Sequence, residues 1–276
     1  MAIYGSNQAS LGGRTGFIQE GKLFSYRSNI LGPADGAPEH PAGFLIEQQG
    51  DTHLGVHFHG SAQFQVVVAG SGRLGPHVLR PVTVHYAGQR TPYGPIVPDA
   101  GGLWYLTLRP RNETGAYFMP GARALRDPAI PRREAFTEPR DVAGPDRPAA
   151  GGVAQAELAT LLPPEDDGLA AWMLTLPADT VMNTPAGLAH GGRFHVVVGG
   201  TCAHGGRDLA WLDMIWTDAT EAPLTVRAGA RGAELLVLQF PTDACAHGMP
   251  EHASNYVNSG FTVFQAPGQR SATGLP

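Results

Sequence analysis

Residues Gly55–Gly70 read Gly-Val-His-Phe-His-Gly-Ser-Ala-Gln-Phe-Gln-Val-Val-Val-Ala-Gly. Two histidines, His57 and His59, precede an apolar run rich in valine that ends at Gly70. Side chains alternate between the two faces of a β-strand, so residues i and i+2 point the same way. The pair can therefore present two imidazoles to one metal ion, a common role of neutral histidines. The valine run is typical of a buried strand closed by a turn.

This stretch resembles the first conserved motif of the cupin superfamily, in which a His-x-His pair is followed by a glutamate and then by a glycine. His57 and His59 match the pair, and Gln63 stands where the family usually has the glutamate. After six intervening residues, Gly70 matches the glycine. The resemblance implies a small antiparallel β-barrel that often holds a divalent metal, with His57, His59 and Gln63 as the expected ligands. A buried amide bonded to backbone is the alternative role of Gln63.

The second motif of the family is eroded, and Ala87–Pro95 is its best match. That alignment puts Tyr93 where a third histidine ligand is expected. A phenol ligates a metal only by losing its proton, which a nearby dication favours. His85, on the preceding predicted strand, is the other candidate, as a third ligand or as a base. Tyr93 and His85 are therefore the predicted catalytic residues, against the alternatives of a turn tyrosine and a surface histidine. Gln65 has the same strand parity as Gln63 and can line the same cavity.

The two halves of the chain repeat each other. Phe64–Gly70 is similar to Phe194–Gly200, 130 residues later, and both are apolar runs ending in glycine. Pro92–Pro110 and Pro223–Pro241 each enclose another apolar strand, at a spacing of 131 residues. Two matched blocks at nearly one spacing indicate an internal duplication.

We therefore expect an all-β protein made of two jelly-roll cupin barrels, residues 1–140 and 141–276, with one or two short helices. Short strands separated by turn signals favour such a fold. The best helix candidate is Val153–Leu162, because two prolines stop it at Pro163. The last predicted strand, Phe261–Gln265, should pair with a barrel edge, since an exposed edge is a liability.

The second half has lost the His-x-His pair. His190 remains near the place of the second histidine, one residue out of register, and Arg193 stands where Gln63 does in the first half. A guanidinium has no acceptor and works against binding a cation. We expect the second barrel to be a degenerate scaffold.

A Cys-x-His tripeptide occurs twice in the second half, as Cys202–His204 and Cys245–His247. Two thiolates and two imidazoles would suit tetrahedral zinc, although their spacing has no physical justification as a zinc motif. These four side chains are an alternative metal site.

Composition narrows the class of partner. The chain has 276 residues, 42% hydrophobic and 16% charged, with 37 glycines and 24 prolines spread along its length. A net charge of −5 and a pI near 6.1 give no electrostatic reason to expect nucleic acid. No stretch is typical of a signal peptide or a bilayer span, and two cysteines are too few for a disulfide framework. We expect a soluble, cytoplasmic protein without a membrane partner. Association into a homo-oligomer stays open.

Three functions fit these observations. The first is a metal-dependent oxidoreductase acting on a small organic substrate, because iron(II) with open coordination positions can bind substrate and dioxygen together. The resemblance implies a dioxygenase-type activity for such a site. The second is a lyase, isomerase or cyclase in which zinc, nickel or manganese acts without redox change. The third is a metal-free barrel that binds a small molecule. Metal content separates the third function from the others, and oxygen dependence separates the first from the second.

Overall fold

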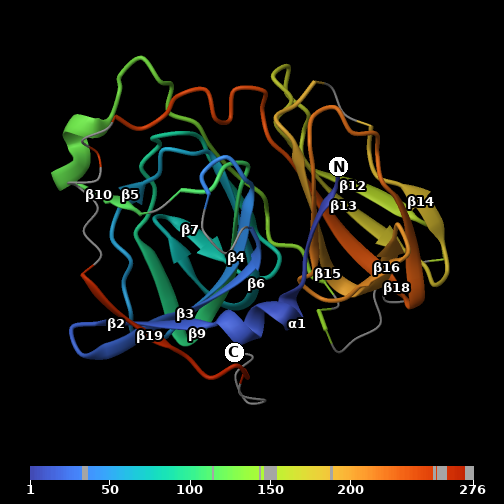
Figure 1. Cartoon of the computed structure of the whole chain (residues 1–276), viewed down its shortest axis with the longest axis horizontal. Helices are drawn as coiled ribbons and strands as arrows, with labels where there is room; N and C mark the ends of the chain where they lie inside the picture. The colour runs from blue at the N-terminus through green and yellow to red at the C-terminus, as the bar shows by residue number, and fades with distance from the viewer. Residues whose placement is uncertain are drawn as a thin grey trace. The chain divides into compact units, whose positions relative to one another are not determined.

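The computed structural model describes residues 1–32, 37–113, 115–142, 144–145, 154–186, 189–250, 253 and 260–270. The chain divides into two compact units (Figure 1). The first barrel comprises Ser10–Arg140 and Ala244–Pro276. The second barrel comprises Met1–Ala9 and Asp141–Asp243. One division falls after Arg140, and each end of the chain groups with the unit that holds the opposite half of the sequence.

The first barrel is built on a nine-stranded sheet in the order β11-β8-β6-β9-β4-β3-β2-β19, with β7 paired to β6. Its strands are β2 (Thr15–Gln19), β3 (Lys22–Leu31), β4 (Ala42–Gln48), β6 (Gln63–Leu74), β7 (His77–Leu79), β8 (Val84–Ala87), β9 (Ile96–Arg109), β11 (Glu134–Phe136) and β19 (Phe261–Gln265). A two-stranded ribbon joins β5 (His57–Phe58) to β10 (Tyr117–Phe118). The first motif thus runs from β5 into the start of β6.

The second barrel is built on an eight-stranded sheet in the order β1-β17-β15-β18-β13-β12, with β14 paired to β18 and β16 to β15. Its strands are β1 (Ile3–Gly5), β12 (Glu157–Leu162), β13 (Ala170–Leu176), β14 (Val181–Asn183), β15 (Arg193–His204), β16 (Arg207–Leu209), β17 (Met214–Thr217) and β18 (Thr225–Gln239). The described ranges include the short helix α1 (Asn7–Ser10) and the 3₁₀ turns η1 (Leu11–Gly13) and η2 (Gly121–Leu125). No helix in those ranges is long and apolar enough to span a membrane.

The duplication is confirmed by strand register. In the first barrel β6 pairs with β8 and β9, and in the second barrel β15 pairs with β17 and β18 in the same antiparallel way. Phe64 lies opposite Leu108, and Phe194 lies opposite Leu238. Both strands also shift register at matching places, between Val67 and Ala69 in β6 and between Val197 and Gly199 in β15. Bulges are specific features of a strand pair, so their repetition at one spacing supports a common origin.

The predicted terminal strand is confirmed, and the predicted helix is wrong. Phe261–Gln265 forms β19 and pairs with β2, and the two lie side by side in Figure 1. Within the predicted helix Val153–Leu162, residues Glu157–Leu162 form β12, and Val153 lies outside the described residues. Strand β12 pairs with β13, whose residues are all buried. Helix propensity is a weak preference, and pairing with a buried strand outweighs it here.

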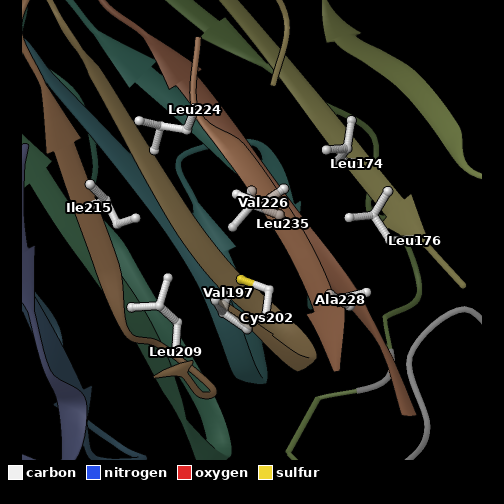
Figure 2. Close-up of a cluster of buried hydrophobic side chains, with 11 residues drawn as sticks. Leu174, Leu176, Val197, Cys202, Leu209, Ile215, Leu224, Val226, Ala228 and Leu235 are labelled. Atoms are coloured by element: carbon white, nitrogen blue, oxygen red, sulfur yellow. The ribbon is translucent and has the colours of Figure 1, made fainter. Parts of the chain in front are cut away.

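The interior of the second barrel is apolar. Figure 2 shows eleven buried side chains from its strands, including Leu174, Ile215 and Leu235, packed as one cluster. Each leucine-sized side chain contributes about 1.5–3 kcal/mol when buried rather than exposed. This cluster is therefore a major source of stability for the second barrel.

Candidate functional site

Strand pairing lines the first barrel with polar side chains. Phe44 on β4 lies opposite Asn29 on β3 and Thr107 on β9. Thr107 lies opposite Gln65 on β6, which in turn lies opposite His85 on β8. Cross-strand neighbours share one face of a sheet, so this row runs across five strands, from Asn29 to His85.

A cavity of about 270 Å³ lies inside the first barrel. Its polar lining includes His57, His59, Gln65, Tyr93 and Thr107, so Gln65 faces the cavity as its strand parity predicts. Its apolar lining is mostly aromatic and includes Phe17, Phe24, Phe44, Tyr105, Phe118 and Phe261. The cavity therefore combines aromatic walls with hydrogen-bonding groups, as small-molecule sites do.

His57 is buried and neutral. Its Nδ1 lies 2.8 Å from the Gly55 carbonyl oxygen, which can only accept, so the ring proton sits on Nδ1. Burial, followed by the influence of His59, lowers the pKa of His57 to about 3. Among the described residues none bonds its Nε2. That nitrogen is thus an acceptor at the edge of the cavity.

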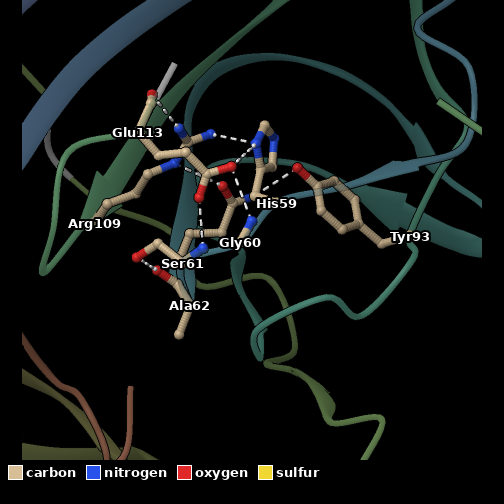
Figure 3. A network of polar contacts seen from close by, with 8 residues as sticks. His59, Gly60, Ser61, Ala62, Tyr93, Arg109 and Glu113 are labelled. Carbon is tan, nitrogen blue, oxygen red and sulfur yellow. Dashed lines mark hydrogen bonds and ion pairs between the residues drawn. The ribbon is translucent and has the colours of Figure 1, made fainter. Parts of the chain in front are cut away.

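His59 is fully engaged by its neighbours (Figure 3). The Arg109 guanidinium donates through Nη2 to His59 Nδ1 at 3.1 Å. Because Nδ1 accepts, the ring proton lies on Nε2. Burial, then Arg109, lowers the pKa of His59. Neither ring nitrogen keeps a free lone pair.

Glu113 completes the network around His59. Its carboxylate accepts from the backbone N–H groups of Gly60 at 2.8 Å and Ser61 at 2.5 Å, and its Oε1 lies 3.6 Å from His59 Nδ1. Burial raises the pKa of Glu113, but contacts with His59 and Arg109 outweigh it and hold that pKa below the usual value. The carboxylate is therefore ionised and fixed by backbone.

Gln63 and Tyr93 bond to each other. Gln63 Nε2 donates to the Tyr93 hydroxyl at 2.6 Å, and Gln63 Oε1 accepts from Arg109 Nε at 3.1 Å. Burial raises the pKa of Tyr93 well above its ordinary value, so the phenol stays protonated. Its hydrogen remains available to a ligand. Of the sequence-predicted residues, His57, His59 and Tyr93 line the cavity, and Gln63 contacts it through the Tyr93 hydroxyl.

His85 is buried behind the cavity lining. Its Nδ1 lies 2.8 Å from Gln65 Oε1, and its Nε2 lies 3.1 Å from Glu134 Oε1. Burial lowers its pKa, although Glu134 acts in the opposite direction. Its two nitrogens face neighbours rather than the cavity, so His85 can position Gln65 but has no direct path to a bound molecule.

Sequence reasoning missed Arg27, Arg109 and Glu113, all of which line the cavity. The internal duplication contained a sequence signal that Arg109 contacts Gln63. Residues 63 and 193 carry Gln and Arg, and residues 109 and 239, at the same spacing, carry Arg and Gln. A reversed pair at equivalent positions indicates that the two side chains contact each other. Nothing comparable pointed to Glu113.

The donor set at the first motif does not fit a divalent cation. His59 Nδ1 accepts from Arg109, so its Nε2 carries the ring proton, and the amide of Gln63 is committed to Tyr93 and Arg109. The Arg109 guanidinium, a permanent cation, sits where a metal's charge would be repelled. Only His57 keeps a free nitrogen. In the described part of the chain, no three His, Cys, Asp or Glu side chains form a group suited to a metal.

The two Cys-x-His tripeptides do not form an alternative metal site among the described residues. Cys202 lies in the apolar cluster of the second barrel, and burial raises the pKa of its thiol to about 12. His204 Nδ1 bonds the Thr225 carbonyl at 2.8 Å. A protonated thiol in an apolar core is a packing group rather than a ligand.

Comparison with known proteins supports the fold. No protein-family model and no curated protein matches the sequence. Bacterial pirin YhhW from Escherichia coli, in complex with nickel(II), aligns with a TM-score of 0.54 at 12% identity, over 87% of this chain and 99% of that one. Procruciferin, an 11S globulin from Brassica napus, aligns with a TM-score of 0.55 at 9% identity, over 88% and 84% of the two chains.

A third similar structure is an 11S globulin from Wrightia tinctoria with an auxin-binding site. It aligns with a TM-score of 0.54 at 11% identity, over 87% of this chain and 83% of that one. At such identities the likeness concerns the fold. The all-β architecture, the duplicated register and these three alignments agree, and the chain has the two-barrel fold of the cupins.

Proposed function

We propose that the first barrel binds a small, largely aromatic organic molecule in its cavity, without a metal ion. The observation that carries this proposal is the closed set of contacts around His59. Arg109 occupies one ring nitrogen of His59 and leaves the ring proton on the other, so neither nitrogen is available to a cupin metal. The cavity beside His59 has a volume of about 270 Å³ and aromatic walls.

The free polar groups suit recognition. His57 Nε2 is an acceptor and the Tyr93 hydroxyl is a donor, and their rings lie close, with centroids 4.5 Å apart. A ligand hydroxyl or carbonyl near both could exchange one hydrogen bond with each. A few placed polar groups within an apolar cavity fix a ligand's orientation.

The pKa values favour binding over proton transfer. A general acid or base works best when its pKa lies near the working pH. The pKa of His57 is lowered to about 3, and that of Tyr93 is raised well above its usual range. At neutral pH His57 is a weak base and Tyr93 a weak acid. Both groups serve better as hydrogen-bonding partners than as proton carriers.

A metal-dependent oxidoreductase of the dioxygenase type is the second candidate. The fold is shared with a pirin that is described in complex with nickel(II). In that case His57, His59, Gln63 and Tyr93 are the residues available to hold iron or a related metal. His59 would first have to exchange Arg109 for the metal, which leaves a buried guanidinium without that partner and is therefore unfavourable.

Elemental analysis and ligand binding test the proposal together. Protein purified without added metal should contain far less than one equivalent of iron, nickel, zinc or manganese. In the presence of a chelator it should still bind benzamide or phenol, measured by calorimetry and by a raised midpoint of thermal unfolding.

The variant Ile46→Phe, which places a ring in the cavity, should abolish this binding. The matched control Leu158→Phe, at an exposed position of β12, should not. One equivalent of metal that is lost in His57→Ala would contradict the proposal and favour the oxidoreductase.

A further inference from the structure

Two arginines converge on one aromatic ring of the cavity. Phe44 lies opposite Asn29 on β3 and Thr107 on β9, and Arg27 and Arg109 are each two residues further along those strands. They share the inward face and are diagonal neighbours of Phe44. Their guanidinium carbons lie 3.8 Å and 5.6 Å from the Phe44 ring centroid.

The hydrogen bonds of these arginines leave donors for a ligand. Arg109 donates through its three nitrogens to neutral acceptors, His59, the Glu113 carbonyl and Gln63. Arg27 donates through Nε to Asn29 Oδ1 at 2.8 Å. Among the described residues Arg27 has no carboxylate partner. Each guanidinium carries five N–H donors, so two remain on Arg109 and four on Arg27 once bonds to described residues are counted.

The charge of the cavity lining does not cancel. Arg27 and Arg109 are cations, and Glu113 is the one carboxylate on the described lining. His57, His59 and Tyr93 are neutral at pH 7, since the pKa of each histidine is lowered and that of the tyrosine is raised. Desolvation, then Arg109, lowers the pKa of Arg27 to about 10, so its charge is unfavourable but retained. Arg27 is partly buried, and no carboxylate on the described lining balances its charge. Removing an unpaired charge from water is costly.

We propose that the cavity selects small aromatic monocarboxylic acids, whose carboxylate binds between Arg27 and Arg109 while the ring packs against Phe44 and the other aromatic walls. This inference rests on the proposed function and specifies its ligand. A monoanion balances the single excess charge, and guanidinium groups match the planar carboxylate in geometry. A phosphate monoester carries nearly two charges at neutral pH and would leave one unbalanced.

Benzoate and benzamide test this inference, because they share shape and ring but differ in charge. Calorimetry at pH 7 with a chelator present should give an affinity for benzoate about tenfold or more above that for benzamide. Equal binding of the two, or tighter binding of benzamide, would overturn the carboxylate site while leaving the proposed function intact. Binding of neither compound would overturn the proposed function and this inference with it.

Variants test whether Arg27 is responsible for the preference for benzoate over benzamide. Arg27→Gln should remove most of the preference for benzoate over benzamide, because it deletes the charge and keeps a polar side chain. Arg27→Lys should retain a reduced preference. Arg73→Gln, at an exposed arginine on β6 that bonds only the Pro76 carbonyl among described residues, is the control and should match the parent protein. An unchanged preference in a folded Arg27→Gln, verified by its thermal unfolding, would refute the role of Arg27.

Discussion

The two barrels place the same pair of side chains in opposite order. In the first barrel Arg109 on β9 donates from Nε to Gln63 Oε1 on β6 at 3.1 Å. In the second barrel Arg193 on β15 donates from Nε to Gln239 Oε1 on β18 at 2.7 Å. The bond is the same, but the guanidinium comes from the other strand. In the first barrel it reaches His59, and in the second it reaches the Pro185 carbonyl at 2.9 Å.

The interiors differ at matched positions further along the strands. Strand register places Ile46 opposite Tyr105 in the first barrel and Leu174 opposite Leu235 in the second. It also places Gln65 opposite His85 and His195 opposite Ile215. Tyr105 and His85 in the first barrel thus correspond to the aliphatic residues Leu235 and Ile215 in the second. One barrel keeps a cavity with polar groups, and the other uses the same strands for an apolar cluster.

The largest effect should come from truncating the apolar cluster. Leu174→Ala should destabilise the second barrel by about 2–5 kcal/mol, since the side chain is completely buried and leaves a cavity. The matched variant Ile46→Ala should cost at least ~1 kcal/mol less, because one side of Ile46 already faces a cavity. Urea unfolding of both variants measures the difference. Equal costs would contradict the contrast between the two interiors.

Exchanging Gln63 and Arg109 should change the free energy of unfolding and the preference for benzoate in different ways. Arg109→Gln alone should cost about 1.5–3 kcal/mol, because His59 and Gln63 lose a charged donor. The double variant Gln63→Arg, Arg109→Gln copies the second barrel and should recover part of that loss. It should still fail to prefer benzoate over benzamide. A double-mutant cycle in urea, with calorimetry, measures both effects. Strict additivity would mean that residues 63 and 109 do not interact.

Acid should destabilise both barrels through buried neutral histidines. Burial is the main cause that lowers the pKa of His57 and of His195 to about 3 in the folded state, against an unfolded value near 6.5. Their contribution is fully present above pH 6.5 and is lost as the pH falls toward 3, because the unfolded chain then binds more protons. Between pH 7 and pH 5 each histidine should reduce stability by about 2 kcal/mol.

His195→Gln tests this in the second barrel, where the ring bonds only Thr217 among the described residues. Urea unfolding of this variant should show a smaller loss of stability between pH 7 and pH 5 than the parent protein does. A loss as large as the parent's would contradict the assignment of a neutral, buried imidazole.

The smallest effect should follow Tyr93→Phe. The Tyr93 hydroxyl accepts from Gln63, so its removal should cost about 1 kcal/mol in urea unfolding. Affinity for phenol should fall only a few-fold, because His57 Nε2 remains. Metal content should not change from its low value. A large drop in metal content would instead assign Tyr93 to a metal site.

The sequence by itself determined the all-β class, the duplication and the terminal strand Phe261–Gln265. Those features depend on local alternation, turn residues and a repeated spacing, which can be read along one strand at a time. The proximity of His57, His59, Gln63 and Tyr93 could also be predicted from the sequence. The first three lie within one short segment, and the family pattern places Tyr93 beside them.

Only the tertiary structure decided what surrounds these residues. Arg109 ends a strand 46 positions after Gln63, and Glu113 follows in a loop, yet both bond to the first motif. Sheet pairing brings them there, and pairing is a non-local property that strand patterns do not encode. The same reason explains β12, where the buried partner β13 outweighs helix propensity. Arg109, from a distant strand, donates a hydrogen bond to His59. A histidine that matches a metal-ligand pattern therefore lines an aromatic cavity with an excess positive charge.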